Sequence, residues 1–115
     1  MPIINSYKFG QMIVDGITYT RDLIITPTQV IPDWWRQEGH LLQADDLHQQ
    51  VEAVAPEILV IGTGKFGLMK VPDSVRQIFA ERDIETIAQN TGSAVKTFNE
   101  ISANRKVVGA FHLTC

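Results

Sequence analysis

The sequence is poor in cysteine, in positive charge and in long apolar runs, and each shortage excludes a class of protein. Cys115 is the single cysteine, so an internal disulfide framework is excluded and a reducing compartment is favoured. The longest apolar runs, such as 58–61, are far shorter than the roughly 20 residues that cross a bilayer. Residues 1–8 carry no signal-peptide pattern. We therefore expect a cytoplasmic protein without membrane insertion.

Positive charge is scarce and scattered. The 10 Lys and Arg residues are outnumbered by 13 Asp and Glu residues, which gives a formal net charge of -3 at pH 7. A protein that binds nucleic acid neutralises several phosphates with clustered basic side chains. The densest basic stretch, 96–106, holds only Lys96, Arg105 and Lys106, and we interpret it as a solvated helix end. We therefore expect no nucleic acid among the partners.

What the sequence does contain is sufficient for one folded domain. Of its 115 residues, 44% are hydrophobic and 20% are charged, which is typical of a globular protein rather than a disordered one. No repeat, low-complexity tract or linker divides the chain, so we predict a single domain over residues 1–115.

The first third of the chain carries β signals. Segments 12–14 and 17–19 flank Asp15-Gly16, a dipeptide typical of a two-residue type I′ turn, and they predict a β-hairpin. Residues 22–26 predict a further strand, because they are rich in Leu and Ile.

The remaining two thirds alternate between helical and strand patterns. From Asp45 apolar residues recur at helical spacing, whereas 57–61 is continuously apolar, as in a strand buried on both faces. Ser74 and Gln77 have capping-box spacing, and Thr91 is a natural N-cap. The predicted elements are an ordered loop over 30–42, helices over 45–56, 72–82 and 91–104, and strands over 57–61, 84–88 and 106–113. This order predicts an α/β fold: a single three-layer domain whose helices flank a central mixed β-sheet, with the N-terminal β-hairpin joining the edge of that sheet or covering it.

Five short blocks resemble one known family. They are Trp35-Arg36-x-x-Gly39-His40, Leu59-Val60-Ile61-Gly62-x-Gly64, Lys70-Val71-Pro72, Thr91-x-x-Ala94-Val95-Lys96-x-x-Asn99 and Phe111-His112-x-Thr114-Cys115. In this order and spacing the chain, over residues 7–115, resembles the adipogenesis-associated MTH-type domain family, which also includes a mitochondrial assembly factor for respiratory complex one. The resemblance implies a three-layer α/β fold with an appended β-hairpin, and it carries over no catalytic residue.

A glycine-rich segment, 62–67, follows the central predicted strand and fits the pattern G-x-G-x-x-G. A dinucleotide site requires the helix to begin within that pattern, whereas 68–71 intervene here, so we expect no nucleotide cofactor. Two interpretations stay open: a structural tight turn, or a pocket for a small ligand or anion. The candidate ligand-binding residues are Gly62, Thr63, Gly64, Lys65, Arg36, His40, Thr91 and Asn99.

Trp34, Trp35 and Arg36 bring together residue types that dominate protein interfaces. Only one of two adjacent Trp side chains can face the core. In one interpretation one Trp fills the core, the other covers the sheet and Arg36 stacks on a ring; in the other, all three form a recognition surface. His40 could act as a base with a nearby acid, but no nucleophile accompanies it, so we name no catalytic residue.

The last predicted strand contains His112 and leads to Cys115. Residues three apart in a strand face opposite sides, and two ligands are too few, so we expect no metal site. We expect His112 to be a buried, hydrogen-bonded imidazole and Cys115 an unreactive thiol. Asn99 is expected to bond to the backbone of an adjoining segment, or to complete a ligand pocket with Thr91.

The sequence completes no reactive centre, and its functional hypotheses follow from the resemblance and from the aromatic loop. The leading hypothesis is a small non-enzymatic accessory or interaction domain that binds a protein partner and helps another protein complex to assemble. The alternative is a small-ligand or anion-binding protein, or an enzyme, that uses the 62–67 loop. A homo-oligomer is compatible with either hypothesis.

Overall fold

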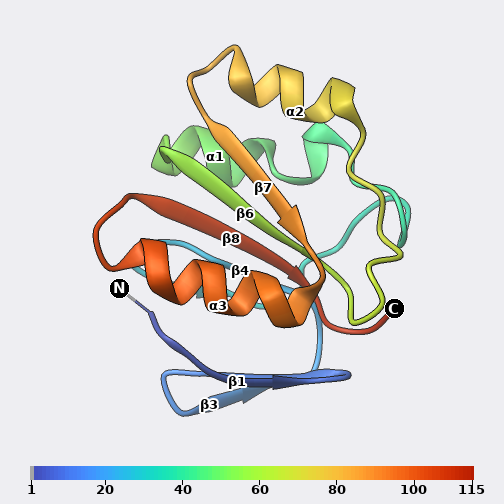
Figure 1. Cartoon of the computed structure of the whole chain (residues 1–115), viewed down its shortest axis with the longest axis vertical. Coiled ribbons are helices and arrows are strands. Elements are labelled where there is room, and N and C mark those ends of the chain that lie inside the picture. The colour runs from blue at the N-terminus through green and yellow to red at the C-terminus, as the bar shows by residue number, and fades with distance from the viewer. Residues whose placement is uncertain (1) are drawn as a thin grey trace.

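The computed structural model describes residues 2–115, and within them the chain forms two β-sheets and three α-helices (Figure 1). The strands are β1 (Ile4–Lys8), β2 (Gln11–Val14), β3 (Ile17–Tyr19), β4 (Leu23–Ile25), β5 (Val30–Ile31), β6 (Ile58–Thr63), β7 (Glu85–Gln89) and β8 (Val107–His112). The α-helices are α1 (His48–Val54), α2 (Asp73–Ala80) and α3 (Thr91–Ser102), and a short 3-10 helix covers Ala44–Asp46. Across residues 2–115, no helix combines the length and the apolar character needed to cross a membrane.

The larger sheet has five strands in the order β5-β4-β8-β6-β7. Strand β6 pairs in parallel with β7 and β8, and β4 runs antiparallel to β8, so the sheet is mixed. All residues of β6 are buried, because its continuously apolar sequence is covered on both faces. The parallel register, which pairs Thr63 with His112, brings the ends of β6 and β8 to the same edge of the sheet.

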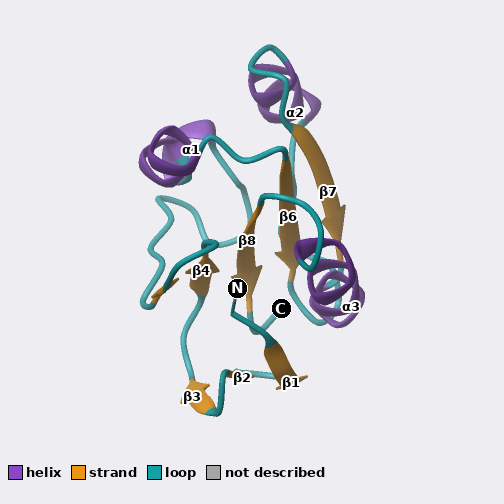
Figure 2. Cartoon of the chain, turned by 90° about the vertical axis from the view of Figure 1, so that its left-hand side faces the viewer, coloured by secondary structure: helices purple, strands orange, loops and turns teal. Residues whose placement is uncertain are grey.

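Alternating side chains divide the core into two layers, one on each face of the larger sheet. Leu59 and Ile61 of β6 pack with side chains from α1 and α2, whereas Val60 packs with α3 and the smaller sheet. Figure 2 shows the larger sheet nearly edge-on, with α1 on one side and α3 on the other. The fold is therefore a three-layer α/β domain, which confirms the predicted fold class.

The smaller sheet has three strands in the order β1-β2-β3 and packs against one face of the larger sheet rather than extending its edge. The predicted β2–β3 hairpin is confirmed, and Asp15 and Gly16 have positive φ angles of 48° and 80°, as a type I′ turn requires. Strand β1 was not predicted, because its residues show no repeated apolar face. Asn99 of α3 holds this strand in place, since its amide donates to Ile4 O at 2.8 Å and accepts from Ile4 N–H at 3.0 Å.

The helix expected over 45–56 is shorter and broken. Leu47 separates the 3-10 helix from α1, and its φ of -124° takes it out of the helical conformation while its side chain is fully buried. The core contact therefore overrides a continuous helix at this residue. The loop expected over 30–42 contains β5, which pairs with β4 through Ile24 and Ile31.

The two later helices begin differently from the sequence expectations. The N-cap of α3 is Asn90, whose Oδ1 accepts a hydrogen bond from Ser93 N–H at 3.0 Å, and not Thr91. Thr91 is fully buried, and its hydroxyl donates a hydrogen bond to His112 O instead of capping the helix. No side chain caps α2, so the capping box expected from Ser74 and Gln77 is absent.

Candidate functional site

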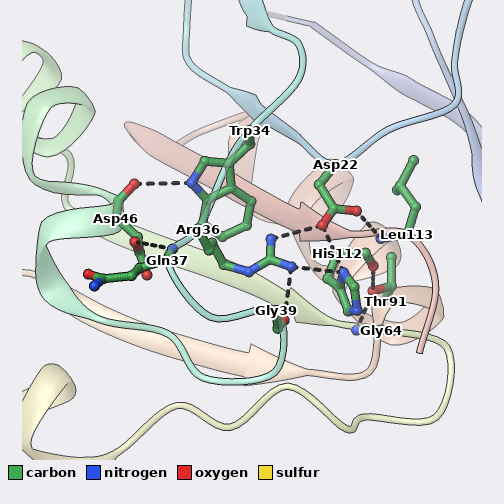
Figure 3. A network of polar contacts seen from close by, with 10 residues as sticks. All are labelled: Asp22, Trp34, Arg36, Gln37, Gly39, Asp46, Gly64, Thr91, His112 and Leu113. Atoms are coloured by element: carbon green, nitrogen blue, oxygen red, sulfur yellow. Dashed lines mark hydrogen bonds and ion pairs between the residues drawn. The ribbon is translucent and has the colours of Figure 1, made fainter.

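A group of charged side chains lies where β4 begins and β8 ends (Figure 3). Asp22 immediately precedes β4, and His112 is the last residue of β8. Antiparallel pairing of these strands brings the two side chains together, although they are 90 residues apart in the sequence. Arg36 reaches the same point from the loop after β5. We call Asp22, Arg36 and His112 the inner cluster.

Short charged contacts hold the inner cluster together. Arg36 Nη1 lies 2.8 Å from Asp22 Oδ2 but off the N–H direction, so the contact is an ion pair rather than a directed hydrogen bond. Asp22 Oδ1 accepts from the Leu113 N–H at 2.8 Å, and Arg36 Nη2 donates to Gly39 O at 3.0 Å. The two side chains are only 17% and 4% exposed, so each charge depends on the other for compensation.

Asp22 also orients the imidazole of His112. The Nδ1 atom of His112 lies 2.8 Å from Asp22 Oδ2 and 3.1 Å from Arg36 Nη2. An ionised carboxylate only accepts hydrogen bonds, so Nδ1 carries a proton and donates a hydrogen bond to Asp22, and the approach of the donor Arg36 Nη2 to Nδ1 is not a second hydrogen bond. The Nε2 atom is buried and has no hydrogen-bond partner among the described residues 2–115. The imidazole is therefore buried and bonded through one nitrogen.

The surroundings of Asp22 keep its carboxyl ionised. Burial alone would raise its pKa, but the hydrogen bonds from His112 and the Leu113 N–H, together with the neighbouring Arg36, outweigh burial and lower the pKa below its usual value. An Asp–His pair can orient a general base, but within residues 2–115 no hydroxyl or thiol is hydrogen-bonded to His112 Nε2. The inner cluster thus contains a buried ion pair that joins the start of β4 to the loop after β5, beside the end of β8.

The two tryptophans beside Arg36 point in opposite directions. Trp34 is 8% exposed, its Nε1–H donates to Asp46 O at 3.0 Å, and its ring lies 4.6 Å from the Arg36 guanidinium carbon. This arrangement agrees with the expectation of one inward Trp with Arg36 stacked on a ring. Trp35 is 77% exposed, so it does not cover the sheet. Of the three interaction candidates, only Trp35 is accessible, because Trp34 and Arg36 are buried.

Two open clefts flank Trp35. The first has a volume of about 330 Å³ and includes Arg21, Asp22 and Asp33 in its wall. The second, of about 350 Å³, has no Lys, Arg or His among its lining residues, and we call it the acidic cleft. Its lining residues are the acidic Asp33, Asp45 and Asp46, the apolar Ile24, Ile31 and Pro32, the aromatic Trp34 and Trp35, and the amide residues Gln37, Gln49 and Gln50.

The backbone of the 62–67 loop is bonded to other parts of the chain. Gly64 has a φ of 102°, which favours glycine, and its N–H donates to Thr91 Oγ1 at 2.9 Å. The Lys65 N–H donates to Thr114 O at 2.7 Å, while the Lys65 residue itself is exposed. These N–H groups have partners within the chain, as a structural turn requires. The helix that follows, α2, begins only at Asp73, well after the glycine pattern.

The remaining ligand candidates are placed in different surroundings. Thr91 Oγ1 donates to His112 O at 2.6 Å, and Thr63 Oγ1 donates to Gln89 O at 3.0 Å. His40 is exposed, with its ring 5.8 Å from that of His112, centre to centre. Gly62 is buried within β6. Arg36, His40 and Thr91 therefore meet around the end of β8, whereas Asn99 lies at β1.

Sequence reasoning did not single out Asp22 or Asp33 as site residues. The only signal for Asp22 is that a buried Arg36 needs a counter-ion, and this need does not select one residue among 13 acidic side chains. Asp33 is positioned by a left-handed backbone conformation, with a φ of 56°, which no local pattern in the sequence predicts.

The fold and these surroundings define a small α/β domain that displays one exposed indole beside an acidic cleft. Residues 4–112 match the family described as a protein of unknown function (DUF498/DUF598). The chain therefore belongs to that family.

Solved structures of similar proteins share this fold along nearly their whole length. A Bordetella parapertussis protein is 26% identical, with a TM-score of 0.82 over 98% of this chain and 96% of that one. A Bartonella henselae protein described as an outer membrane protein is 25% identical, with a TM-score of 0.83 over 99% and 96%. A Bordetella pertussis protein described as a Mth938-like domain is 23% identical, with a TM-score of 0.74 over 97% and 85%. This last likeness concerns the fold alone, and it agrees with the resemblance of the sequence to MTH-type domains.

Proposed function

We propose that this chain is a protein-interaction domain that binds a partner through the surface around Trp35 and assists the assembly of another protein complex. The observation that carries the proposal is the position of Trp35, which is 77% exposed between two clefts. Tryptophan is strongly enriched among the residues that dominate interface energies, because its indole buries a large area at a small cost in side-chain entropy.

The backbone that carries Trp35 is anchored on both sides. Trp34 bonds to Asp46 through its indole N–H, and the Trp34 backbone N–H donates to Asp22 O at 2.8 Å. Arg36 is fixed by its ion pair with Asp22 and its bond to Gly39 O. A partner would therefore meet a preformed surface, and binding would order few additional side chains, which favours affinity.

The accessory role is supported by two further points. The sequence resembles a family that includes an assembly factor. The polar groups at the end of β8 are bonded chiefly to one another, with Asp22 paired to Arg36 and Thr91 bonded to His112 O. These contacts link the start of β4, the end of β8 and α3 to the loop that carries Trp35, which supports a scaffold role for this end of the sheet.

The test uses the full chain as bait in its native host, followed by identification of the proteins that co-purify. Trp35→Ser removes the proposed contact, and Phe66→Ser is the matched control, because Phe66 is also aromatic and 68% exposed but lines neither cleft. We expect the wild type and the Phe66→Ser variant to retain a common partner. Trp35→Ser should weaken binding of that partner, once purified, by at least about tenfold, as truncation of a central hot spot does. A partner bound equally by the Trp35→Ser variant would contradict the proposal.

A further inference from the structure

The acidic cleft beside Trp35 has an excess of negative charge among its lining residues. No Lys, Arg or His in its lining balances Asp33, Asp45 and Asp46. Asp46 accepts hydrogen bonds from the backbone N–H groups of Gln43 and Gln37, so Asp33 and Asp45 are the carboxylates most available to a partner. We infer that the partner of this chain presents a segment rich in Lys and Arg, and that one of its cationic side chains enters the acidic cleft. The inference rests on the proposed interaction role of Trp35 and specifies the chemistry of the partner.

The charge of the acidic cleft contrasts with that of its neighbour. In the first cleft, Asp22 is compensated by Arg36 at 2.8 Å. In the acidic cleft, Asp33 has only a loose contact with Arg21 at 3.9 Å, between side chains that are 68% and 80% exposed. Such a contact is weak in water. The acidic cleft therefore keeps a negative potential that favours a cationic partner.

The walls of the acidic cleft suit a long cationic side chain. Ile31, Pro32 and Trp35 offer apolar surface for the methylene groups of Lys or Arg, while the carboxylates can receive the charged end. The chain already contains one such arrangement, since the Arg36 guanidinium carbon lies 4.6 Å from the centre of the Trp34 ring. Arginine is favoured over lysine, because its guanidinium stacks on indole and binds carboxylates through two N–H groups at once.

Other ligand classes fit these observations less well. Phosphates of nucleic acids and acidic segments would be repelled by the three carboxylates. A bound metal ion needs ligands that converge on one point, and no group of three His, Cys, Asp or Glu side chains within residues 2–115 is placed to hold one. Carboxylates spread along a cleft instead match a side chain that lies along it.

The first experiment is an NMR titration of the full chain with two short peptides. One alternates arginine with serine, and in the other citrulline, which is neutral and nearly the same shape, replaces each arginine. We expect the arginine peptide to shift the indole N–H signal of exposed Trp35 more than that of buried Trp34. The citrulline peptide should bind at least about tenfold more weakly, and added salt should weaken the arginine peptide further.

A pair of charge-matched variants locates the binding site. Asp33→Asn combined with Asp45→Asn neutralises two carboxylates of the acidic cleft, and asparagine tolerates the left-handed backbone at residue 33. Glu81→Gln combined with Glu100→Gln changes the net charge equally at exposed residues that do not line the cleft. We expect only the first pair to weaken binding of the arginine peptide, by about tenfold. The inference would be overturned if both peptides bound alike, or if the arginine peptide did not shift the Trp35 signal. It would also be overturned if both variants lost binding equally, or if calcium chloride alone caused the same shifts.

The native partner separates this inference from the proposed function on which it rests. If Trp35→Ser loses that partner but the combined Asp33→Asn and Asp45→Asn variant retains it, the interaction role of Trp35 is supported. The inference that the partner binds through a cationic segment is then overturned. If Trp35→Ser retains the partner, the interaction role itself fails.

Discussion

Segment 33–36 has two faces that differ in chemistry. Trp34 and Arg36 turn inward and are each 8% exposed, whereas Trp35 and Asp33 turn outward. Trp34, Trp35 and Arg36 alternate in direction along the chain, so one short loop can contribute to the core and to the surface at once. The comparison teaches that two adjacent tryptophans can serve different purposes: Trp34 fixes the loop, and Trp35 is displayed by it.

The two faces also differ in how their charges are compensated. On the inner face the Arg36 charge meets the Asp22 carboxylate within 2.8 Å. On the outer face the acidic cleft gathers Asp33, Asp45 and Asp46 without a cationic lining residue. Changes on the inner face should therefore alter stability, and changes on the outer face should alter binding alone.

The largest expected effect comes from removing the inner guanidinium. Arg36→Met keeps much of the side-chain volume but leaves the buried Asp22 carboxylate without its ion pair, so the free energy of unfolding should fall by about 3 to 5 kcal/mol. Arg21→Met is the control, because the Arg21 side chain is 80% exposed, and it should lower that free energy by less than about 1 kcal/mol. Urea unfolding measures both values. Similar decreases in unfolding free energy for the two variants would contradict the stabilising role proposed for the inner face.

Asp22→Asn tests the anion of the inner cluster and its dependence on pH. Because the folded-state pKa of Asp22 is lowered, its stabilisation is complete above the unfolded-state pKa of about 3.9 and is lost as the pH falls through the lower folded-state value. The variant should lose about 2 to 3 kcal/mol of unfolding free energy at neutral pH, where the wild-type carboxylate is charged. Unfolding free energies measured from about pH 5 down to about pH 2 should decline less in the variant than in the wild type. An identical decline would show that Asp22 does not titrate as described.

Matched replacements of the two tryptophans compare the faces directly. Trp34→Phe removes the indole N–H that bonds to Asp46 O and should lower the free energy of unfolding by about 1 to 2 kcal/mol. Trp35→Phe changes an exposed side chain and should leave that free energy within about 0.5 kcal/mol of the wild type. Thermal unfolding of both variants provides the measurement. The prediction fails if Trp35→Phe is the more damaging of the two.

Much of the fold could be predicted from the sequence, because its strongest patterns are local. The run 58–61 is apolar at every residue and lies inside β6, between two other strands. The Asp15-Gly16 turn requires two positive φ angles, and the dipeptide indicates them. Strand β5 could not be predicted, because it has only two residues and exists through its pairing with β4.

The site was only partly predictable, because its decisive contacts join distant parts of the chain. Alternation predicts that one Trp faces inward, but the choice of Trp34 depends on its backbone N–H bonding to Asp22 O. Arg36 and His112 are 76 residues apart, and their contact depends on the whole sheet. The surroundings of Thr91 illustrate the same limit: a residue that looks like an N-cap is drawn inward by His112 O and the Gly64 N–H.

The smallest expected effect on stability tests the outer face. The combined Asp33→Asn and Asp45→Asn variant removes two of three like charges from one cleft, and it loses only the loose contact of Asp33 with Arg21. Relief of repulsion should offset that loss, so the free energy of unfolding should stay within about 0.5 kcal/mol of the wild type or rise slightly. Urea unfolding at low salt, where surface charges act most strongly, is the sensitive measurement. A decrease of about 2 kcal/mol or more in the free energy of unfolding would show that these carboxylates stabilise the fold. Carboxylates that add nothing to stability, yet are needed for binding a cationic segment, are explained only by recognition.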